Sequence, residues 1–363
     1  LVAGTAPALL LEGEKPRLID EWQVAPVLWD AIRVDVDKKG MNGQYILTGS
    51  SSPPQEATMH TGTGRFARLA MKTLSLFESL DSSGDVSLAE LSGKQSMVHC
   101  KSDRSIQDIA FLICRGGWPK SIGLPEKNAL LTMREYVKAI FHHDMVEVGN
   151  VKIDPRRVEL FLKSYARHIQ TLAKNTTILE DMRGQVVDAT MPTIYGYQDT
   201  LQRMFIIDEI PAWAPDIRSR TSIRTSNKRS FVDPAIATAI LKLTPASLLS
   251  DFEYFGLLFE SLCIRDLRIY AESMDAHVMH YRDRHGLECD AVIQLANGGF
   301  GLVEIKLGGV EEDKAADNLL RLESLLFEKK KPKPVFKMIL TGGQYGYTRP
   351  DGVHVVPITC LRD

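Results

Sequence analysis

Two short apolar segments near the start of the chain end in polar residues that suit nucleotide hydrolysis. Arg17-Leu-Ile runs into Asp20 and Glu21, and Tyr45-Ile-Leu runs into Thr48. When parallel strands deliver such residues at their carboxyl ends, one carboxylate can hold Mg²⁺ and a second can orient water. A threonine on the neighbouring strand can contact the terminal phosphate. The pattern therefore predicts the back half of a nucleotide-hydrolysing site.

The front half of such a site is a glycine-rich phosphate loop, and the 363 residues contain no G-x-x-x-x-G-K-[S/T] pattern. The backbone amides and the lysine of that loop would hold the phosphates. In folds of this kind the loop precedes the Asp-Glu strand, but only 19 residues precede Asp20, and the first is Leu1 rather than Met. We therefore expect the numbering to begin inside an ATPase domain.

A second group of acidic residues lies in the last third of the chain. In Glu304-Ile-Lys306 the period of a strand places the Glu and Lys side chains on one face, and Asp290 is expected on the adjacent hairpin strand. Glu260, on a preceding helix, could supply a third oxygen ligand. Such a cluster suits Mg²⁺, with Lys306 placed to polarise an attacking water, and predicts phosphodiester cleavage. The alternatives are ordinary surface alternation of charge and a domain that binds without cutting.

Between these two groups, residues 217–230 carry five positive charges and no acidic residue. The cations are Arg218, Arg220, Arg224, Lys228 and Arg229. Such a cluster is typical of contacts with phosphates, and the preceding pattern is typical of a helix-turn-helix with a wing. DNA contact is one hypothesis, and a solvated turn or docking onto an acidic domain is the other.

The spacing of apolar residues predicts that helices and strands alternate along the chain and carry these residues. Helices are predicted over 24–39, 127–148, 155–172, 193–203, 255–270 and 311–329. Strands are predicted at 17–19, 45–47, 65–76, 204–210, 277–281, 290–295, 301–307, 335–340 and 353–357. The polar stretch 79–103 is predicted to be a domain boundary.

Composition excludes several classes of protein. The net charge is -2, with 25% charged and 44% hydrophobic residues, so contact with nucleic acid or a membrane surface would have to be local. No stretch approaches the ~18 uninterrupted apolar residues of a membrane helix. The cysteines form no C-x-x-C pair and are predicted to be reduced, cytoplasmic thiols: Cys100, Cys114, Cys263, Cys289 and Cys360.

The order of the motifs resembles a family of archaeal and bacterial AAA-type ATPases. Members carry a C-terminal domain of unknown function with a restriction-nuclease-like core. The resemblance covers most of the chain and rests on Asp20-Glu21-x-Gln23, Thr48-Gly-Ser50, Gly64-Arg65, Arg115-Gly-Gly117-Trp-Pro119, Ile210-Pro-Ala-Trp213, Phe231-x-Asp233, Phe259-Glu260, Glu288-x-Asp290 and Glu304-Ile-Lys306. One departure is Cys289, which stands where the family motif has proline before the aspartate.

The resemblance implies particular roles in the nucleotide site. Asp20 would be the magnesium-linked carboxylate, Glu21 the base that orients water, Thr48 the sensor and Arg65 an arginine finger. Each residue also has a plain structural interpretation. A strand that ends in Asp-Glu is often a helix-capping pair, and an arginine after glycine is often a solvated surface residue.

We thus predict a multidomain α/β protein. Its parts would be a partial P-loop or AAA-type parallel sheet (1–80), a helical connector or lid (81–150), a winged helix (151–245) and a restriction-nuclease-like α/β domain (246–363). The predicted function is ATP binding and hydrolysis with Mg²⁺, coupled to a nuclease-like domain that acts on or binds nucleic acid. The alternative is an ATP-dependent switch whose nuclease-like domain is a non-cutting platform. DNA is a candidate partner, no membrane is expected, and formation of a homo-oligomer is left open.

Overall fold

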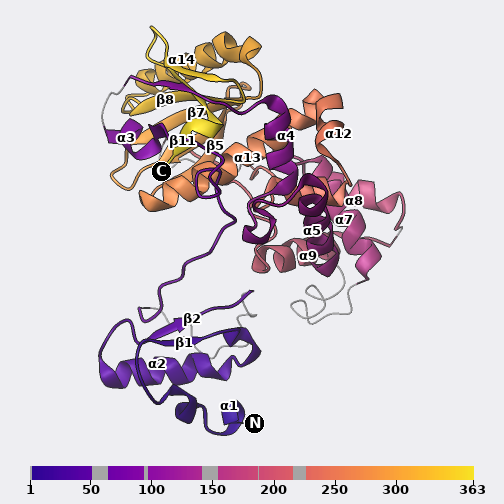
Figure 1. The fold of residues 1–363 in the computed structure, drawn as a ribbon, viewed down its shortest axis with the longest axis vertical. Coiled ribbons are helices and arrows are strands. Elements are labelled where there is room, and N and C mark those ends of the chain that lie inside the picture. The colour runs from indigo at the N-terminus through magenta and orange to yellow at the C-terminus, as the bar shows by residue number, and fades with distance from the viewer. Residues whose placement is uncertain (1, 51–63, 94–96, 141–153, 187, 216–225) are drawn as a thin grey trace.

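The computed structural model describes residues 2–50, 64–93, 97–140, 154–186, 188–215 and 226–363. The fold is mixed α/β, as predicted, and has an N-terminal unit, a helical middle and a C-terminal sheet (Figure 1). The N-terminal unit is joined to the remainder by an extended segment. This segment occupies the residues predicted as a strand over 65–76, and it pairs with no sheet there. Among the described residues, no helix has both the length and the apolar character needed to cross a membrane.

The N-terminal unit is a small strand–helix–strand arrangement, which confirms the predicted one. Strand β1 (Arg17–Ile19) pairs in parallel with β2 (Tyr45–Leu47), and α2 (Val27–Lys39) connects them. Leu28 and Ile32 of α2 are buried against this pair. The short helices that complete the unit are α1 (Val2–Thr5), η1 (Pro7–Leu11) and η2 (Trp22–Val24).

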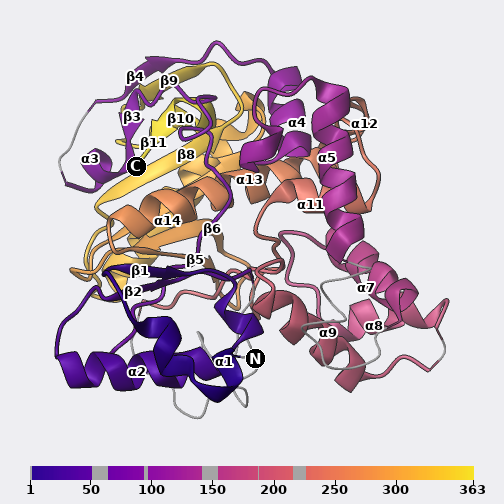
Figure 2. The same ribbon diagram turned by 60° about the horizontal axis from the view of Figure 1, so that its bottom comes forward.

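The middle of the chain is helical, and Figure 2 shows α4 and α5 lying alongside each other. A capping box at Ser105 starts α4, because its side chain accepts from the Asp108 amide while Asp108 accepts from the Ser105 amide. Asp154 caps α7, which has proline in its first turn. The helices are α4 (Ile106–Arg115), η4 (Pro119–Ser121), α5 (Glu126–Ala139), α7 (Pro155–Arg167), α8 (Asn175–Arg183), α9 (Met191–Arg203), α11 (Pro234–Ile240) and α12 (Pro245–Ser250).

Two differences from prediction occur here. The end of the helix predicted over 127–148 lies outside the described residues beyond residue 140. The strand predicted over 204–210 is reduced to two antiparallel bridges, Ile207 with Phe231 and Ile210 with Lys228. We call residues 207–212 and 226–231, which these bridges join, the bridged hairpin.

The C-terminal part is a seven-stranded mixed sheet in the order β4-β9-β10-β8-β7-β6-β5. Strands β7, β8 and β10 run parallel, and the other pairings are antiparallel. The long helix α13 packs on one face and α14 on the other. The elements are α13 (Phe252–Ser273), β5 (His277–Arg282), β6 (Glu288–Gln294), β7 (Phe300–Lys306), η6 (Gly309–Glu311), α14 (Glu312–Glu328), β8 (Phe336–Thr341), β9 (Tyr345–Thr348), β10 (His354–Pro357), η7 (Ile358–Cys360) and β11 (Leu361–Arg362).

The polar stretch predicted as a domain boundary instead supplies strands to this C-terminal part. Strand β4 (His99–Lys101) forms the edge of the large sheet by pairing with β9. Strand β3 (Val86–Ser87), followed by α3 (Leu88–Gly93), pairs in parallel with β11. Strands β3 and β4, which lie within the predicted connector, thus pair with strands from the last part of the chain.

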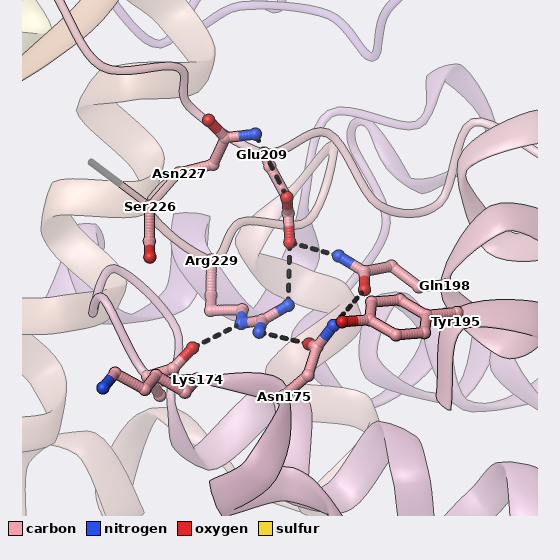
Figure 3. Close-up of a pocket in the computed structure, with 9 residues that line it drawn as sticks. Lys174, Asn175, Tyr195, Gln198, Glu209, Ser226, Asn227 and Arg229 are labelled. Atoms are coloured by element: carbon pink, nitrogen blue, oxygen red, sulfur yellow. Dashed lines mark hydrogen bonds and ion pairs between the residues drawn. The ribbon is translucent and has the colours of Figure 1, made fainter. Parts of the chain in front are cut away.

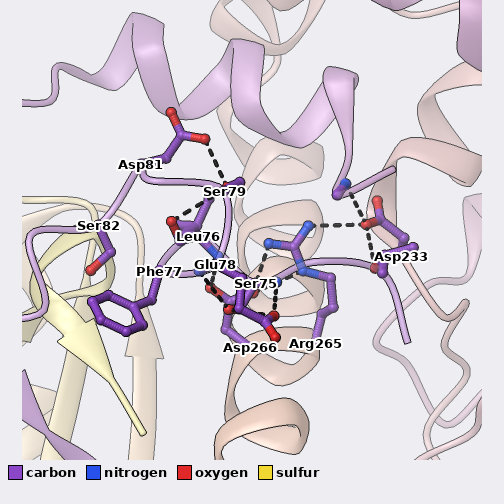
Figure 4. A network of polar contacts seen from close by, with 12 residues as sticks. Ser75, Leu76, Phe77, Glu78, Ser79, Asp81, Ser82, Asp233, Arg265 and Asp266 are labelled. Atoms are coloured by element: carbon purple, nitrogen blue, oxygen red, sulfur yellow. Dashed lines mark hydrogen bonds and ion pairs between the residues drawn. The ribbon is translucent and has the colours of Figure 1, made fainter. Parts of the chain in front are cut away.

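A buried ionic junction fastens the extended segment to the helical and C-terminal parts (Figure 4). Arg265 of α13 lies between Asp233 and Asp266, and each of the three side chains is at most 2% exposed. Arg265 Nη1 donates to Asp233 Oδ2 at 2.9 Å, and Arg265 Nε donates to Asp266 Oδ1 at 2.8 Å. Asp266 also accepts from the Leu76 amide at 3.0 Å, and Asp233 accepts from Thr73 Oγ1 at 2.9 Å. These contacts join three stretches that are distant in the sequence.

Two consecutive glycines allow the turn after α4 to reach this junction. Gly116 has a φ of 71°, and a Cβ there would lie 2.8 Å from Ala235 Cβ. A Cβ on Gly117 would lie 2.1 Å from the carbonyl oxygen of Leu74. Gly117 N donates to Asp233 Oδ2 at 3.0 Å, and its carbonyl accepts from Leu74 N at 2.8 Å. The Arg-Gly-Gly motif thus permits close contact between two backbones.

Candidate functional site

The two predicted strands bring Asp20 and Thr48 together at their carboxyl ends. Thr48 Oγ1 donates to Asp20 Oδ1 at 2.5 Å, and Thr48 N donates to the carbonyl of Ile19 at 2.9 Å. The carboxylate of Glu21 accepts from Gln23 Nε2 and, at 3.4 Å, from Ser50 Oγ. Asp20, Glu21 and Thr48 therefore form a contiguous polar edge, and the side chains of Asp20 and Glu21 are exposed.

Arg65, the predicted arginine finger, lies on the surface of the same unit. Its Nε donates to Asp37 Oδ1 of α2 at 2.8 Å. Both side chains are about two-fifths exposed, at 42% and 40%. The structure thus places this guanidinium beside α2, and it gives Arg65 an intramolecular carboxylate partner.

The predicted carboxylate cluster of the C-terminal part assembles on one face of β6 and β7. Glu304 and Lys306 share a face, as predicted, and Lys306 Nζ lies 3.0 Å from Glu304 Oε2. Lys306 Nζ also lies 3.3 Å from Asp290 Oδ2, which accepts from the Ile305 amide at 2.9 Å. Adjacent antiparallel strands therefore bring two carboxylates and one ammonium group into contact.

A second lysine, Lys228, enters this cluster from the bridged hairpin. Its Nζ lies 2.6 Å from Glu260 Oε1 on α13 and 3.6 Å from Asp290 Oδ1 on β6. Lys228 is only 6% exposed. The basic neighbours of this residue in the sequence predict a contact with nucleic acid. The structure instead commits its charge to buried carboxylates.

Burial and charge divide the three carboxyl groups of the cluster. Burial raises the pKa of Glu304 to about 8, with the Asp290 charge adding to the effect. Burial likewise raises the pKa of Glu260 to about 7. Burial also opposes ionisation of Asp290, but Lys228 and Lys306 outweigh it and lower the pKa of that carboxyl. Asp290 is therefore the group of the three that most favours its charged form.

The cluster does not fit a divalent metal ion. Among the residues that the structure describes, no three His, Cys, Asp or Glu side chains are arranged so that they could hold a metal. Two ammonium groups lie among the expected ligands Glu260, Asp290 and Glu304. The sequence predicts carboxylates that are free to bind a metal ion. In the structure, Lys228 and Lys306 form ion pairs with these carboxylates instead.

Asn318 of α14 is a member of this site that had no sequence signal. Its Nδ2 donates to Glu304 Oε1 and to the carbonyl of Glu288, each at 2.7 Å. An asparagine within an amphipathic helix carries no pattern that separates such a role from solvent exposure. Its position opposite Glu304 depends on how α14 packs across the sheet.

Arg229, also a predicted contact with nucleic acid, lines an open polar hollow of about 260 Å³ (Figure 3). Its Nη1 donates to Glu209 Oε1 at 2.8 Å, and its Nε donates to the Ala173 carbonyl at 3.0 Å. Glu209 accepts in addition from Gln198 Nε2 at 2.7 Å. Arg229 is 5% exposed, so its charge is also committed internally. The hollow is lined by Ala173, Lys174, Asn175, Tyr195, Gln198, Glu209, Ser226, Asn227 and Arg229.

The remaining predicted phosphate contacts, Arg218, Arg220 and Arg224, lie outside the described residues. The described residues on either side of them belong to the bridged hairpin, which follows α9. On α9, Tyr195 is 57% exposed, whereas Tyr197 is buried in the core. Helices α7, α8 and α9 and then the bridged hairpin thus precede α11 directly among the described residues.

Comparison with known protein families gives two matches. Residues 106–247 match a family model described as a domain of unknown function, DUF8612. Residues 255–361 match a second domain of unknown function, DUF4143. No curated protein matches the chain. The first match covers the helical middle from α4 into α12. The second runs from within α13 to β11 and includes every strand of the large sheet except β4.

Proposed function

We propose that this chain is part of an AAA-type protein that binds and hydrolyses ATP and thereby switches a nucleic-acid-binding C-terminal domain. The observation that carries the proposal is the hydrogen bond between Thr48 and Asp20 at the ends of paired parallel strands. The C-terminal match supports it, because DUF4143 is commonly found with AAA-type ATPase regions.

The residues of the N-terminal edge suit ATP and Mg²⁺. Asp20 offers a carboxylate oxygen, the ligand type that Mg²⁺ prefers, and its hydrogen bond to Thr48 fixes its orientation. Glu21 follows directly and would orient water toward the terminal phosphate. When bound, Mg²⁺ would neutralise charge on the phosphates.

Glu21→Gln is expected to leave ATP binding intact and to slow hydrolysis by about 100-fold or more, because an amide cannot activate water as a carboxylate does. The measurement is phosphate release by the full-length protein, with ATP affinity determined in parallel. Glu14→Gln, an exposed change of the same type in the same unit, should keep the wild-type rate. Unchanged turnover in Glu21→Gln would refute the role of this carboxylate.

The C-terminal part is proposed to be a restriction-nuclease-like domain that binds without cutting. In support of the nuclease-like character, Asp290, Glu304 and Lys306 meet on one face of adjacent strands. The non-cutting form is favoured because Lys228 lies between Glu260 and Asp290, where catalysis would require a metal ion. The switch would then act on binding rather than on cleavage.

Nucleic-acid binding is proposed for the basic stretch near residue 220. Replacing Arg218, Arg220 and Arg224 together by Ala should weaken binding to duplexes of any sequence. The slope of log affinity against log salt should fall by about 0.9 for each lost phosphate contact, or about 2.7 for three. Fluorescence anisotropy over a salt series measures both quantities.

A matched control removes three lysines from the other basic run, which follows α14. Lys329, Lys330 and Lys333 are exposed, and their replacement by Ala removes the same charge. We expect this control to retain the wild-type slope. Equal slopes in both triple variants would assign the arginine stretch to contacts within the protein.

A further inference from the structure

We propose that the ammonium group of Lys228 is the resident cation of the carboxylate cluster and takes the place of a divalent metal. Through this contact it fastens the bridged hairpin to the C-terminal sheet. The inference rests on the non-cutting form of the proposed function, and it can be tested without ATP or nucleic acid.

The backbone around Lys228 is held in a fixed position. Its N donates to the Ile210 carbonyl at 3.0 Å, and its carbonyl accepts from Ile210 N at 3.0 Å. The opposite arm is attached to the sheet, because Trp213 N donates to the His280 carbonyl at 2.7 Å and Trp213 Nε1 donates to Gln294 Oε1 at 2.8 Å. The hairpin is therefore docked beside β5 and β6, which delivers the Lys228 side chain into the cluster.

The charges around Lys228 match an ammonium ion. Burial opposes its charged form, but the charges of Glu260 and Asp290 outweigh that cost and raise its pKa. His280, buried nearby, has a pKa lowered to about 4, first by burial and then by the Lys228 charge. The neighbouring imidazole therefore stays neutral, and Lys228 supplies the positive charge beside Glu260.

A divalent ion would have to compete with this lysine for the same oxygens. Mg²⁺ binds carboxylate oxygens at about 2.0–2.1 Å, and the Lys228 ammonium group already lies 2.6 Å from Glu260 and 3.6 Å from Asp290, so the two positive charges would repel each other at close range. Removing the amine should leave these carboxylates without their cation. Glu260 and Asp290 would then be free to move together onto a hard metal ion, which their present arrangement does not hold.

The test is a titration of the purified chain with Mn²⁺, followed by calorimetry and thermal unfolding. We expect the wild type to bind Mn²⁺ at Asp290 only weakly. Lys228→Ala should bind one Mn²⁺ about 100-fold more tightly than the wild type, because a close positive charge has been removed. Its Tm should rise with Mn²⁺, and the added change Asp290→Asn should abolish both effects.

Two controls keep the outcome decisive. Lys333→Ala removes an exposed lysine and should not create Mn²⁺ binding. Lys228→Met retains most of the aliphatic stem and replaces Lys228→Ala if that variant does not fold.

The proposal is overturned if the folded variant gains no Mn²⁺ site. It is equally overturned if the wild type binds Mn²⁺ stoichiometrically and loses it on Glu304→Gln. Magnesium-dependent nicking by the wild type that disappears in Lys306→Ala would also overturn it. If the wild-type protein neither hydrolyses ATP nor binds DNA, the proposed function is wrong, but the expected Mn²⁺ binding by Lys228→Ala is unaffected.

Discussion

Asp233→Ala is expected to lower the free energy of unfolding by about 3–5 kcal/mol, because it would leave a buried arginine without one of its carboxylates. Asp233 is fully buried and accepts from Arg265 Nη1 at 2.9 Å. It also accepts from Thr73 Oγ1, Gly117 N and the Ala235 amide at the start of α11. This one substitution therefore leaves four hydrogen-bond donors, from different parts of the chain, without their acceptor.

A surface ion pair of similar length supplies the control. Asp313 lies 2.7 Å from Arg349 Nη1, but its side chain is 89% exposed. Asp313→Ala should cost about 0–1 kcal/mol, because water screens the pair. Urea denaturation of both variants, monitored by circular dichroism, gives the comparison. Equal losses in the two variants would show that the junction does not hold the parts together.

Gly117→Ala is expected to lower the free energy of unfolding by at least about 1–3 kcal/mol, which is the usual cost of overpacking. The added Cβ would lie 2.1 Å from the Leu74 carbonyl oxygen and 2.9 Å from its amide nitrogen. Both are backbone atoms, so no side-chain rotation can relieve the overlap. The Gly117–Leu74 hydrogen bond at 2.8 Å would have to break or lengthen.

Gly196→Ala is the matched control and should have the opposite sign. Gly196 lies within α9, is exposed, and has no atom within 4 Å of an added Cβ. Alanine should therefore stabilise the helix by about 0.8–1 kcal/mol. The shift of Tm in each variant is the measurement. A neutral Gly117→Ala would mean that the turn and the extended segment separate readily.

Local periodicity was enough to predict much of the fold. The unit of β1, α2 and β2 follows from apolar spacing and from Gly40, which ends α2 with a φ of 64°. Helix α14 and the strands around Glu304 also follow from such spacing. The pairing of β3 and β4 with the last part of the chain could not be predicted in this way. Short polar strands acquire their structure from distant partners rather than from their own sequence.

The candidate sites show the same division. Side chains that share a strand face, such as Glu304 and Lys306, could be placed from spacing alone. Lys228 and Arg229 could not, because a run of positive charge has the same sequence pattern whether it faces phosphates or buried carboxylates. Only the fold brings Glu260 and Glu209 to these lysine and arginine side chains. The three arginines of the same run remain predicted contacts.

Strands β3 and β4 set an order for folding during translation. Val98 N donates to Thr348 Oγ1, 250 residues later, and β3 pairs with β11 at the end of the described chain. At about 5–20 residues per second, a ribosome would need about 10–50 s to make the intervening segment. Throughout that time β4 has no partner, and an unpaired strand edge invites association with other chains. A fragment limited to residues 255–361 would lack β4 permanently and leave β9 as an open edge.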